Sequence, residues 1–418
     1  MNRRVVITGL GTNNPIGNSP EETWANASAG RSGIGPLSRI DTTDLKTTIA
    51  GEVKDFDPVA LFGSKNARRM DRATQLAMTA ALQAIEDCDM EFDEELKKET
   101  GVVLGCGMGN IGSAIEGFNT FSKKGPRRIS PFFIPMMLAD SPAAAISIEN
   151  GLQGPNMVIA TACAAGSNAL GEAAAMIMRG AAEVMLAGGA EAPLLPLVIA
   201  GFNATGALST RNSHPEQASR PFDADRDGFV AGEGSAILIL EELDHALQRG
   251  AKIYGEFLGY GTSADAYHIS APSKNGEGAI ISMKSALKDA GLDPKQIDYI
   301  NAHGTGTRLN DKIETLAIKK VFGEQAYDIP ISSTKSIHGH LLGAAGALEA
   351  LISVMAINNE LIPPTINYAT ADPDCDLDYV PNSSRPGQIQ NFLSNGFGLG
   401  GHNASIIVGR YDNGKWAR

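Results

Sequence analysis

Basic charge and cysteine are both scarce in this sequence of 418 residues. Lysine and arginine together number 35 against 47 acidic residues, so the formal net charge is −12 and no general nucleic-acid-binding surface is indicated. An acidic partner would need a local basic patch that works against the overall field. The cysteines lack CxxC spacing, which predicts a reducing compartment and neither a disulfide framework nor a metal site. They are Cys88, Cys106, Cys163 and Cys375.

Uninterrupted apolar runs long enough to cross a membrane are also missing. The longest apolar stretch, from about 173 to 202, is broken by Arg179, Glu183, Glu191 and two prolines, which argues against a membrane span. The N-terminal segment MNRRVVITGLG runs directly into a strand-like stretch and has no signal-peptide pattern. We therefore expect a soluble cytoplasmic protein.

Short apolar runs alternate instead with amphipathic stretches along the whole chain. Continuous apolar strands between helices predict a buried mixed or parallel sheet, and hence an α/β fold. The predicted strands are Arg4–Thr8, Thr100–Leu104, Met157–Ala160, Val184–Ala187, Ala236–Glu241, Ile253–Gly259, Tyr299–Asn301, Ile329–Ser332 and Ser405–Gly409. The predicted helices are Arg72–Glu86, Asn168–Arg179, Gly278–Ala290, Asp311–Phe322 and Ala344–Asn358.

Two parts of the chain have the same plan. VVLGCG resembles YINAHGTGT, and MVIATACAAGSNAL resembles PISSTKSIHGHLLGAAGALEA. This indicates an internal duplication with a divide near residue 250, so we predict an N-terminal half (1–250) that carries Cys163 and a C-terminal half (251–418) that carries two histidine turns. The polar, turn-rich segment Arg211–Gly228 is predicted to be a surface insertion.

Cys163 lies between a predicted strand and a predicted helix, in TACAAGSNAL. Free backbone N–H groups and the positive end of the helix dipole at such a turn favour a thiolate. Small neighbours from Thr161 to Gly166 leave space around the sulfur. The residues alone leave open whether Cys163 is a nucleophile or a small buried thiol.

Two of the seven histidines occupy glycine-containing turns after strands. His303 lies in NAHGTGTRLND and His340 in STKSIHGHLLGAAG. A histidine can act as a base or, when neutral, donate an N–H toward developing negative charge. A structural role is the alternative for either one alone.

Lys335 precedes His340 at a predicted strand exit, where a buried ammonium is costly unless it is paired. Glu349 and Glu314 are candidate partners, because each lies on an otherwise apolar helical stretch. A buried Lys–Glu pair could hold a nearby histidine neutral. A solvent-exposed lysine is the alternative.

Two glycine-rich segments remain. NGFGLGGHN, from Asn395 to Asn403, is predicted to be a turn before the last strand, and its glycines permit a backbone oxyanion donor. GCGMGNIG looks like a dinucleotide fingerprint, but no acidic residue follows at the expected spacing, so a dinucleotide site is rejected.

These segments together resemble the β-ketoacyl-acyl-carrier-protein synthases, the elongating condensing enzymes of type II fatty acid synthesis. The resemblance covers essentially the whole chain, in order. It rests on VVITGLG, TACAAGSNAL, GGAEAP, ALSTRN, RPFDADRDGFVAGEGSAILILE, AHGTGTRLND, STKSIHGHLLGAAGALEA and NGFGLGGHN. It implies a thiolase-like fold with a duplicated αβαβα five-layer core, a homodimer, and an acyltransferase.

The implied reaction is the decarboxylative Claisen condensation of an acyl group held on Cys163 with malonyl-acyl-carrier protein. The resemblance makes Cys163 the nucleophile, and His303 and His340 the groups that assist decarboxylation. Lys335 supports them, paired with Glu349, while Asp311 and Glu314 belong to the same polar network. The implied oxyanion hole is formed by the backbone N–H groups of Cys163 and Leu399.

The resemblance also implies an acyl pocket and a docking surface. Met108, Phe202 and Leu399 match positions that line the pocket. Acyl carrier protein, in its acyl and malonyl forms, is the implied partner, and it delivers the phosphopantetheine, so no bound cofactor is expected. The implied docking residues are basic: Lys65, Arg68, Arg69, Arg127 and Arg128.

Several residues depart from the family pattern. Leu399 replaces a gating phenylalanine, Gly206 an arginine that helps docking, and His338 a threonine beside His340. Arg308 stands where proline is common, and Met136 and Met137 enlarge a segment near the dimer-side pocket. These departures leave substrate length and carrier identity open.

Three alternatives follow from the same motifs. A ketosynthase of polyketide or other specialised metabolism would use the same chemistry on another acyl chain. A non-elongating partner subunit typically lacks the active cysteine, which is present here. A degradative thiolase would share the fold, but AHGTGT and STKSIHGH argue against it.

Overall fold

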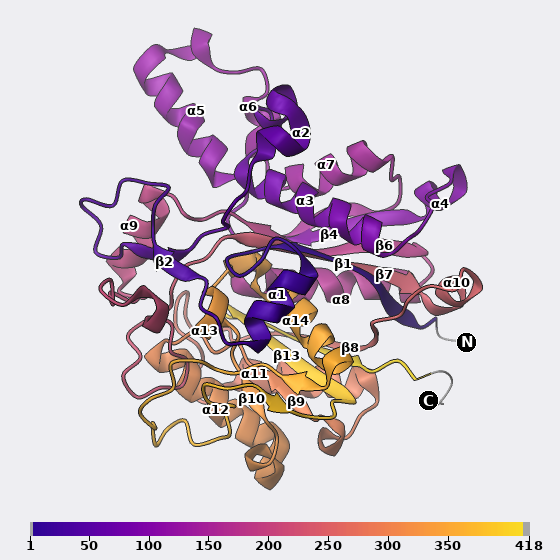
Figure 1. The fold of residues 1–418 in the computed structure, drawn as a ribbon, viewed down its shortest axis with the longest axis vertical. Coiled ribbons are helices and arrows are strands. Elements are labelled where there is room, and N and C mark those ends of the chain that lie inside the picture. Colours follow the sequence, from indigo (N-terminus) through magenta and orange to yellow (C-terminus); the bar gives the residue numbers. More distant parts are fainter. Residues whose placement is uncertain (1–2, 413–418) are drawn as a thin grey trace.

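The computed structural model describes residues 3–412, and the apolar runs of the sequence become the strands of a ten-stranded sheet (Figure 1). The strand order in the N-terminal half is β5 (Asn156–Ile159), β4 (Thr100–Gly105), β6 (Val184–Glu191), β7 (Gly234–Glu242) and β1 (Val5–Asn13). The order in the C-terminal half is β10 (Ile331–Ser332), β9 (Tyr299–Asn301), β13 (Asn391–Gly398), β14 (His402–Gly409) and β8 (Gly255–Ala264).

The two halves repeat one topology. In each, the spatial order is third, second, fourth, fifth and first strand of that half. The second strand pairs in parallel with the third and fourth, and the fifth strand pairs antiparallel with the fourth and first. Strands β1 and β8 join the halves through an antiparallel contact of Val5–Ile7 with Gly255–Phe257. The predicted duplication is therefore a property of the fold, while the division at residue 250 stays a prediction.

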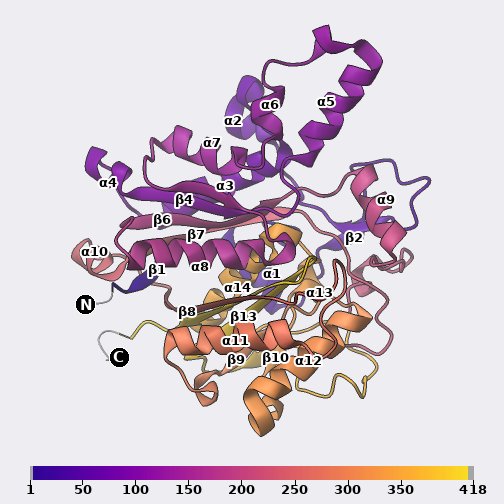
Figure 2. The same cartoon turned by 180° about the vertical axis from the view of Figure 1, so that it is seen from behind.

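Helices form three layers around the two halves of the sheet (Figures 1 and 2). The N-terminal half packs α3 (Arg72–Asp87) and α7 (Ser141–Asn150) on its outer face. The middle layer is α8 (Ala165–Met178) and α14 (Ala345–Asn359), and the other outer layer is α11 (Glu277–Ala290) and α12 (Arg308–Phe322). The layers follow the order αβαβα, so the predicted five-layer thiolase-like α/β fold is confirmed.

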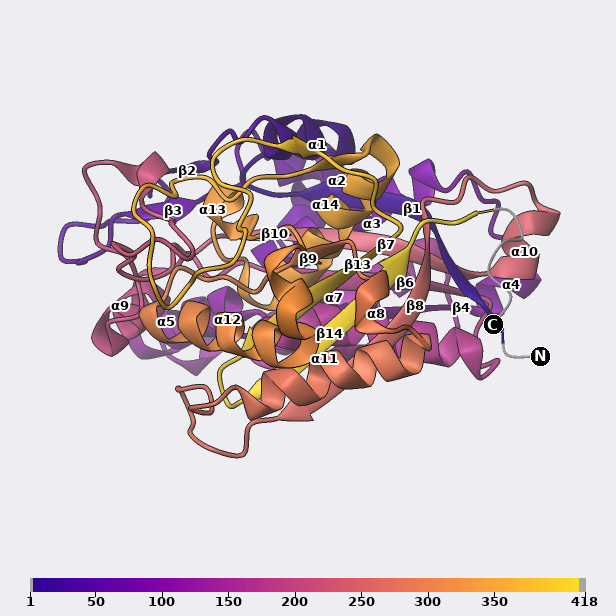
Figure 3. The same cartoon turned by 90° about the horizontal axis from the view of Figure 1, so that it is seen from below.

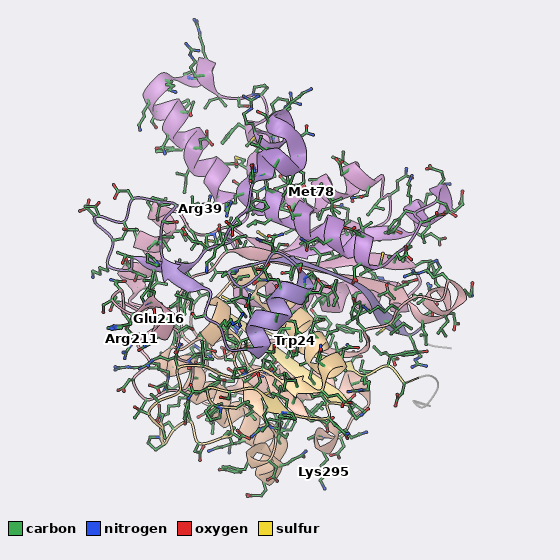
Figure 4. The ribbon with its side chains drawn as sticks, in the orientation of Figure 1. Trp24, Arg39, Met78, Arg211, Glu216 and Lys295 are labelled. Carbon is green, nitrogen blue, oxygen red and sulfur yellow. The ribbon has the colours of Figure 1, made fainter. Side chains whose placement is uncertain are left out.

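Helix α14 is apolar on all sides because it lies between the two halves of the sheet. Among the described residues, one helical stretch, Leu342–Asn359, is long and apolar enough to cross a membrane. Its 83% burial within the fold makes it weak evidence for a span. Trp24, on α1 (Pro20–Ser28), packs against the same core beside α14 (Figure 4).

Most of the remaining elements lie at the ends and edges of the layers, whereas α13 is buried. Helices α2, α5 and α6 project from the N-terminal half (Figure 1), and α9 lies at the end opposite α10 (Figure 3). Their bounds are α2 (Pro58–Ala67), α4 (Glu94–Lys98), α5 (Ile111–Lys124), α6 (Phe133–Met137), α9 (Pro196–Thr205), α10 (Leu243–Gln248) and α13 (Lys335–His338). Four short strands form two small sheets: β2 (Ile34–Pro36) with β3 (Ile49–Gly51), and β11 (Leu361–Ile362) with β12 (Arg385–Pro386).

Two predictions about local structure are wrong. The glycine-rich segment 395–403 is not only a turn, because Asn395 to Gly398 are the second half of strand β13 and the turn proper covers 399–401. The segment Arg211–Gly228 is a surface insertion only at its start. Figure 4 shows Arg211 and Glu216 at the edge of the molecule.

The second part of that segment is buried. Phe222 is 0% exposed and stacks on Tyr379 with ring centroids 3.9 Å apart. Arg226 is 3% exposed and forms ion pairs with Asp311 and Asp372. The polar residues of this part therefore belong to a buried network, although the turn-rich composition predicts exposure to solvent.

Candidate active site

Cys163 lies at the start of the middle layer, on a tight turn between β5 and α8. The turn is the 3₁₀ helix η2 (Ala162–Ala164), and Ala162 has a positive φ of 50°. Helix α8 then begins at Ala165, earlier than predicted, without a side-chain cap at its N-terminus. The strand-to-turn-to-helix placement predicted for Cys163 is confirmed.

Cys163 lines a cavity of about 660 Å³ to which both halves of the chain contribute. Strand ends and turns of the C-terminal half supply its two imidazoles, His303 and His340. The remaining walls near the sulfur are largely apolar. They include Phe202, Phe229, Leu342, Phe397 and Leu399.

His340 is held as one defined tautomer. Its Nδ1 accepts a hydrogen bond from the Leu342 N–H at 3.2 Å, so the proton of the neutral ring lies on Nε2. Burial, followed by the positive charge of Lys335, holds the pKa of His340 well below its usual value. The side chain is therefore a neutral N–H donor at physiological pH.

His303 lies beside His340, with ring centroids 5.4 Å apart and the planes at 83°. Its ring is buried, and Nδ1 has no hydrogen-bond partner among the described residues. Burial first, then Lys335 and His340, hold the pKa of His303 well below its usual value. The neutral ring of His303 lines the cavity together with His340.

Lys335 is buried, with 1% exposure, and its ammonium forms an ion pair with Glu349 on α14. The solvent-exposed alternative is therefore wrong. Burial raises the pKa of Glu349 to about 7, and Lys335 opposes that rise. The Lys335 charge lowers the pKa of both His303 and His340. This agrees with the prediction that a buried Lys–Glu pair could hold a nearby histidine neutral.

Glu314 and Asp311 share the first turns of α12 but hold different loops. Glu314 accepts hydrogen bonds from the backbone N–H groups of His303, at 2.7 Å, and Gly304, at 2.8 Å. Burial raises the pKa of Glu314 to about 7, and these hydrogen bonds oppose it. Asp311 accepts from the Phe222 N–H at 2.8 Å, and burial raises its pKa. Glu314 lines the cavity, whereas Asp311 lies behind it.

The turn after β13 brings the Leu399 N–H near the Cys163 sulfur, where it opposes the rise in the pKa of the thiol that burial causes. The N–H of Cys163 itself has no backbone or side-chain acceptor among the described residues. A Cβ at Gly398 would lie 3.1 Å from the Cys163 nitrogen, so glycine keeps that donor accessible. Two N–H groups thus converge near the sulfur, as an oxyanion hole requires.

The charge state of Cys163 is set by opposing effects. Burial raises the pKa of the thiol to about 12, whereas the Lys335 ammonium and the Leu399 N–H lower it. The expectation that the turn favours a thiolate is therefore offset by desolvation. The side chain of the free protein is a thiol.

The three predicted pocket residues have different positions. Phe202 and Leu399 line the cavity, and the Leu399 side chain is 50% exposed. Met108 does not line the cavity. It packs instead against the apolar cluster that contains Cys163, as Phe202 does.

The predicted docking residues are all exposed, on the projecting part of the N-terminal half. Lys65 lies on α2, and Arg68 and Arg69 follow it directly. Arg127 and Arg128 belong to the short 3₁₀ helix Pro126–Arg128 after α5. The Arg69 guanidinium lies 4.0 Å from the centroid of the Phe132 ring, which connects α2 to the α5–α6 region.

The departures from the family pattern have different surroundings. His338 is fully buried, and its Nε2 lies 3.0 Å from the Thr334 hydroxyl. Burial and Lys335 lower the pKa of His338 to about 3, so it is neutral. Gly206 and Arg308 both line the mouth of the cavity. Met136 and Met137 lie on α6, outside the cavity lining.

One buried carboxylate beside this site was missed by the sequence reasoning. Glu191, at the end of β6, is 1% exposed and accepts three backbone hydrogen bonds near Cys163. A glutamate between two alanines at the end of an apolar strand is costly to bury without partners, and that cost was the available signal. Among the described residues, no group of three or more His, Cys, Asp or Glu side chains has the arrangement of a metal site.

Comparisons with known proteins agree over nearly the whole chain. The family model "Beta-ketoacyl synthase, N-terminal domain" matches residues 2–246, and "Beta-ketoacyl synthase, C-terminal domain" matches residues 254–369. The chain is 51% identical over 409 residues to 3-oxoacyl-[acyl-carrier-protein] synthase 2 of Synechocystis sp., covering 98% of each chain. It is 48% identical over 408 residues to the protein of that name from Coxiella burnetii, covering 98% of this chain and 99% of the other.

Solved structures show the same similarity. A type II PKS acyl-carrier protein in complex with its ketosynthase, bound to the hexaketide, matches with a TM-score of 0.92 and 37% identity, covering 99% of this chain and 100% of that one. The ishigamide ketosynthase/chain length factor matches with the same values. A β-ketoacyl synthase from Burkholderia phymatum has a TM-score of 0.90 and 36% identity, covering 98% and 100%.

Proposed function

This chain belongs to the β-ketoacyl synthase family, and from that membership we propose that it elongates acyl chains in fatty acid synthesis. It is an acyltransferase that condenses an acyl group with malonyl-acyl-carrier protein to give β-ketoacyl-acyl-carrier protein. The observation that carries the proposal is one cavity in which the Cys163 thiol faces two neutral imidazoles, His303 and His340.

The first half-reaction is acyl transfer to Cys163. The sulfur attacks the carbonyl carbon of the acyl thioester, a new C–S bond forms, and the bond to the carrier's sulfur breaks. The leaving sulfur takes up the proton that the Cys163 thiol gives up. The N–H groups of Cys163 and Leu399 stabilise the tetrahedral oxyanion, because they converge near the sulfur before the substrate arrives.

The second half-reaction is decarboxylative condensation. The malonyl group loses carbon dioxide, and the electron pair of the broken C–C bond forms an enolate-like carbanion. Its carbon attacks the Cys163 thioester, the C–S bond breaks, and the sulfur takes up one proton from solvent. Neutral His340 donates its Nε2–H to the developing enolate oxygen, with His303 beside it. No strong base is required, because carbon dioxide leaves without transferring a proton.

Lys335, Glu349, Glu314 and Asp311 support this arrangement without touching the reacting atoms. Burial and, after it, the Lys335 charge keep both histidines neutral, and Glu349 compensates for the buried ammonium. Glu314 fixes the His303 turn through two backbone hydrogen bonds. Asp311 lies behind the cavity and holds the buried loop around Phe222 by accepting a hydrogen bond from the Phe222 N–H.

Acyl carrier protein is the proposed partner, and its phosphopantetheine arm brings both substrates, so the enzyme needs no bound cofactor. A solved relative was captured as a ketosynthase with its acyl-carrier protein. In this chain, the exposed cluster of Lys65, Arg68 and Arg69 supports docking of an acidic partner on a protein of net charge −12. Arg127 and Arg128 extend the basic surface.

A cytoplasmic homodimer is the proposed assembly. Within residues 3–412, strand β5 pairs only with β4 and forms one edge of the large sheet, and its Met157 is 38% exposed. An open edge of this kind favours pairing with another chain. Large exposed apolar side chains lie in the same region of the sequence, on α5 to β5: Phe118, Phe121, Phe132, Ile134, Leu138 and Ile148. A solution mass of twice 43.8 kDa would support the dimer, and a mass of one chain would contradict it.

The acyl pocket is proposed to extend from Cys163 past Phe202 and Leu399, with Met108 limiting its length. Met108 supports this role because it packs in the apolar cluster around Cys163 rather than at the open mouth. Its flexible thioether can adapt to different chain ends. Replacing Met108 should therefore affect the acyl chains that are long enough to reach it.

The alternatives are less favoured. The relatives named 3-oxoacyl-[acyl-carrier-protein] synthase 2 are 47–51% identical, whereas the type II PKS ketosynthase is 37% identical. A non-elongating subunit does not need Cys163 or both imidazoles, which this cavity has. A degradative thiolase shares the fold but uses another arrangement of histidine and cysteine.

Intact-mass measurement across a panel of acyl-carrier thioesters tests this function. Each accepted chain should add the mass of one acyl group to the enzyme. Malonyl-carrier should then remove that mass, release carbon dioxide and yield β-ketoacyl-carrier. An enzyme that takes up no acyl group from any chain length, or that releases no carbon dioxide, would contradict the proposal.

A further inference from the structure

Glu191 is a buried carboxylate at the end of β6 that the proposed reaction does not use. Its Oε2 accepts hydrogen bonds from the N–H groups of Gly107, at 2.5 Å, and Gly343, at 2.9 Å. Its Oε1 accepts from the Met108 N–H at 3.1 Å. Three backbone donors to one carboxylate form an anion-binding site that the chain itself fills.

The three donors come from two loops that contact different groups of the site. Met108 packs in the apolar cluster around Cys163, on the side proposed for the acyl chain. Gly343 directly follows Leu342, whose N–H holds Nδ1 of His340 and so fixes its tautomer. One carboxylate therefore connects the acyl side of the sulfur to the histidine that faces the malonyl group.

The internal duplication explains where this site comes from. Strands β6 and β13 are both eight residues long and hold the same place in their halves, and they end at Glu191 and Gly398. The turns that follow the third strands, η2 (Ala162–Ala164) and η6 (Leu342–Ala344), both lead directly into a middle-layer helix. In this correspondence, Gly343 is the counterpart of Cys163.

The Glu191 carboxylate occupies the place that corresponds to the open space beside Cys163. A Cβ at Gly343 would lie 2.6 Å from Glu191 Oε2 and 2.2 Å from the Gly107 nitrogen, so no side chain fits there. At the other centre, Gly398 leaves the Cys163 N–H accessible. The same backbone geometry thus makes an open hole in one half and a filled hole in the other.

We propose that Glu191 is a positioning residue that fills the second anion hole and thereby couples the acyl side of Cys163 to the alignment of His340. This inference rests on the proposed condensation. Without the carboxylate, the Leu342–Gly343 backbone is free to shift and the Leu342 N–H no longer holds His340 in one tautomer. Malonyl decarboxylation then suffers more than acyl transfer.

The first test compares Glu191→Gln with Glu241→Gln at pH 8. Glu241 is also a fully buried glutamate on the same pair of strands, but it lies opposite Val184 at the far end of β6. Acyl transfer is followed by intact mass, and carbon dioxide release is measured on enzyme that is already acylated. We expect Glu191→Gln to lower carbon dioxide release about tenfold or more while acyl transfer of a short chain stays within about twofold. Glu241→Gln should leave both rates within about twofold, whatever its melting temperature.

The second test restores the anion. In Glu191→Ala, added formate can occupy the vacated hole, and we expect it to raise carbon dioxide release at least about threefold over chloride at equal ionic strength. Equal rates in formate and chloride would overturn the anion-hole assignment. If Glu191→Ala does not fold, Glu191→Gln decides: wild-type rates in both half-reactions, with a stability loss like that of Glu241→Gln, would overturn the coupling. If the wild-type protein itself shows neither half-reaction, the proposed function fails instead.

Discussion

The two halves of the molecule contain the same strand–turn–helix unit, and only one of them is open to a substrate. The turns η2 and η6 begin with residues of positive φ, 50° at Ala162 and 47° at Leu342. They end with nearly identical backbone angles, φ −87° at both Ala164 and Ala344. Each leads into a helix of the middle layer.

The difference between the two turns comes from two pairs of residues. The N-terminal turn has Cys163 with Gly398 beside it, whereas the C-terminal turn has Gly343 with Glu191 beside it. The backbone geometry that concentrates N–H groups is therefore common to both. Whether it stabilises a reaction intermediate or an internal carboxylate depends on the side chain at the end of the neighbouring strand.

Removing the nucleophile should have the largest effect. Cys163→Ala deletes the atom that carries the acyl group, so β-ketoacyl-carrier formation should fall on the order of 10³-fold or more. The fold should persist, because the substitution shortens a side chain that borders a cavity. Cys88→Ala, at the buried end of α3, is the matched control and should retain activity. If the Cys163→Ala enzyme still elongated acyl chains, the difference between the two turns would have no bearing on function.

Substituting the two histidines tests whether decarboxylation and acyl transfer depend on different groups. His340→Ala or His303→Ala should lower malonyl decarboxylation about 10²-fold, because each removes a neutral donor at the developing charge. Acyl transfer to Cys163 should fall much less, since the N–H groups of Cys163 and Leu399 remain. Separate measurement of carbon dioxide release and of acyl-enzyme mass distinguishes the two steps. Equal losses in both would contradict this division of roles.

Exchanging glycine for alanine in each turn tests the comparison directly. In Gly398→Ala, the new Cβ would lie 2.7 Å from the Thr161 carbonyl oxygen and 3.1 Å from the Cys163 nitrogen. We expect some loss of stability and, through loss of the oxyanion donor, a fall of about 10²-fold in acyl transfer. In Gly343→Ala, the Cβ meets the Gly107 nitrogen and Glu191, so the main effect should be a loss of about 3 kcal/mol in unfolding free energy. Denaturant unfolding and acylation rates, measured on both variants, report the two effects. Similar profiles for the two variants would show that the turns do not differ in role.

The surface should also differ between the halves, because the basic helices project from the N-terminal half alone (Figure 1). Replacing Lys65, Arg68 and Arg69 with glutamate should raise KM for acyl-carrier substrates about tenfold at low salt. The effect should shrink as ionic strength rises, because exposed charges are screened. Replacing Lys284 and Lys288 of α11 with glutamate, in the C-terminal half, is the control with the same type of charge reversal. An unchanged KM would show that Lys65, Arg68 and Arg69 are ordinary solvated charges without a role in docking.

The last prediction concerns the pH dependence of stability. Burial raises the pKa of Glu191 to about 7, above its ordinary value of 4.5. A carboxyl whose folded pKa is raised stabilises the fold most below about pH 4.5, and that stability is lost as pH rises through about 7. Relative to Glu191→Gln, which does not titrate, the wild-type protein should therefore lose about 3 kcal/mol between those limits. Unfolding free energies of both proteins across this range measure the difference, and parallel curves would contradict the assigned pKa.

Much of the fold could be predicted because its strands are continuous apolar runs. Strand β9, Tyr299–Asn301, was predicted with its observed bounds, and the α/β alternation followed from such runs. Strand β13 was missed because its glycines resemble a turn. They are required by close approach instead: a Cβ at Gly396 would lie 3.2 Å from the Ser167 hydroxyl. Contacts between distant segments are not visible as a local pattern.

The site shows the same limit. Cys163, His303 and His340 stand out because each is an uncommon residue in a small-residue turn, and the structure brings all three to one cavity. Glu191 also lies among small residues, in GGAEAP, but it is one of 47 acidic residues and therefore not an uncommon type. Its partners lie 84 residues away at Gly107 and 152 residues away at Gly343, so its role appears only in the folded chain.

The most direct test is to locate the acyl group after single-turnover mixing with an acyl-carrier thioester, without malonyl-carrier. Peptide mapping by mass spectrometry should find one acyl group per chain, on the peptide that contains Cys163, and malonyl-carrier should then discharge it. An acyl group on any other residue, or one at Cys163 that malonyl-carrier leaves in place, would contradict the account.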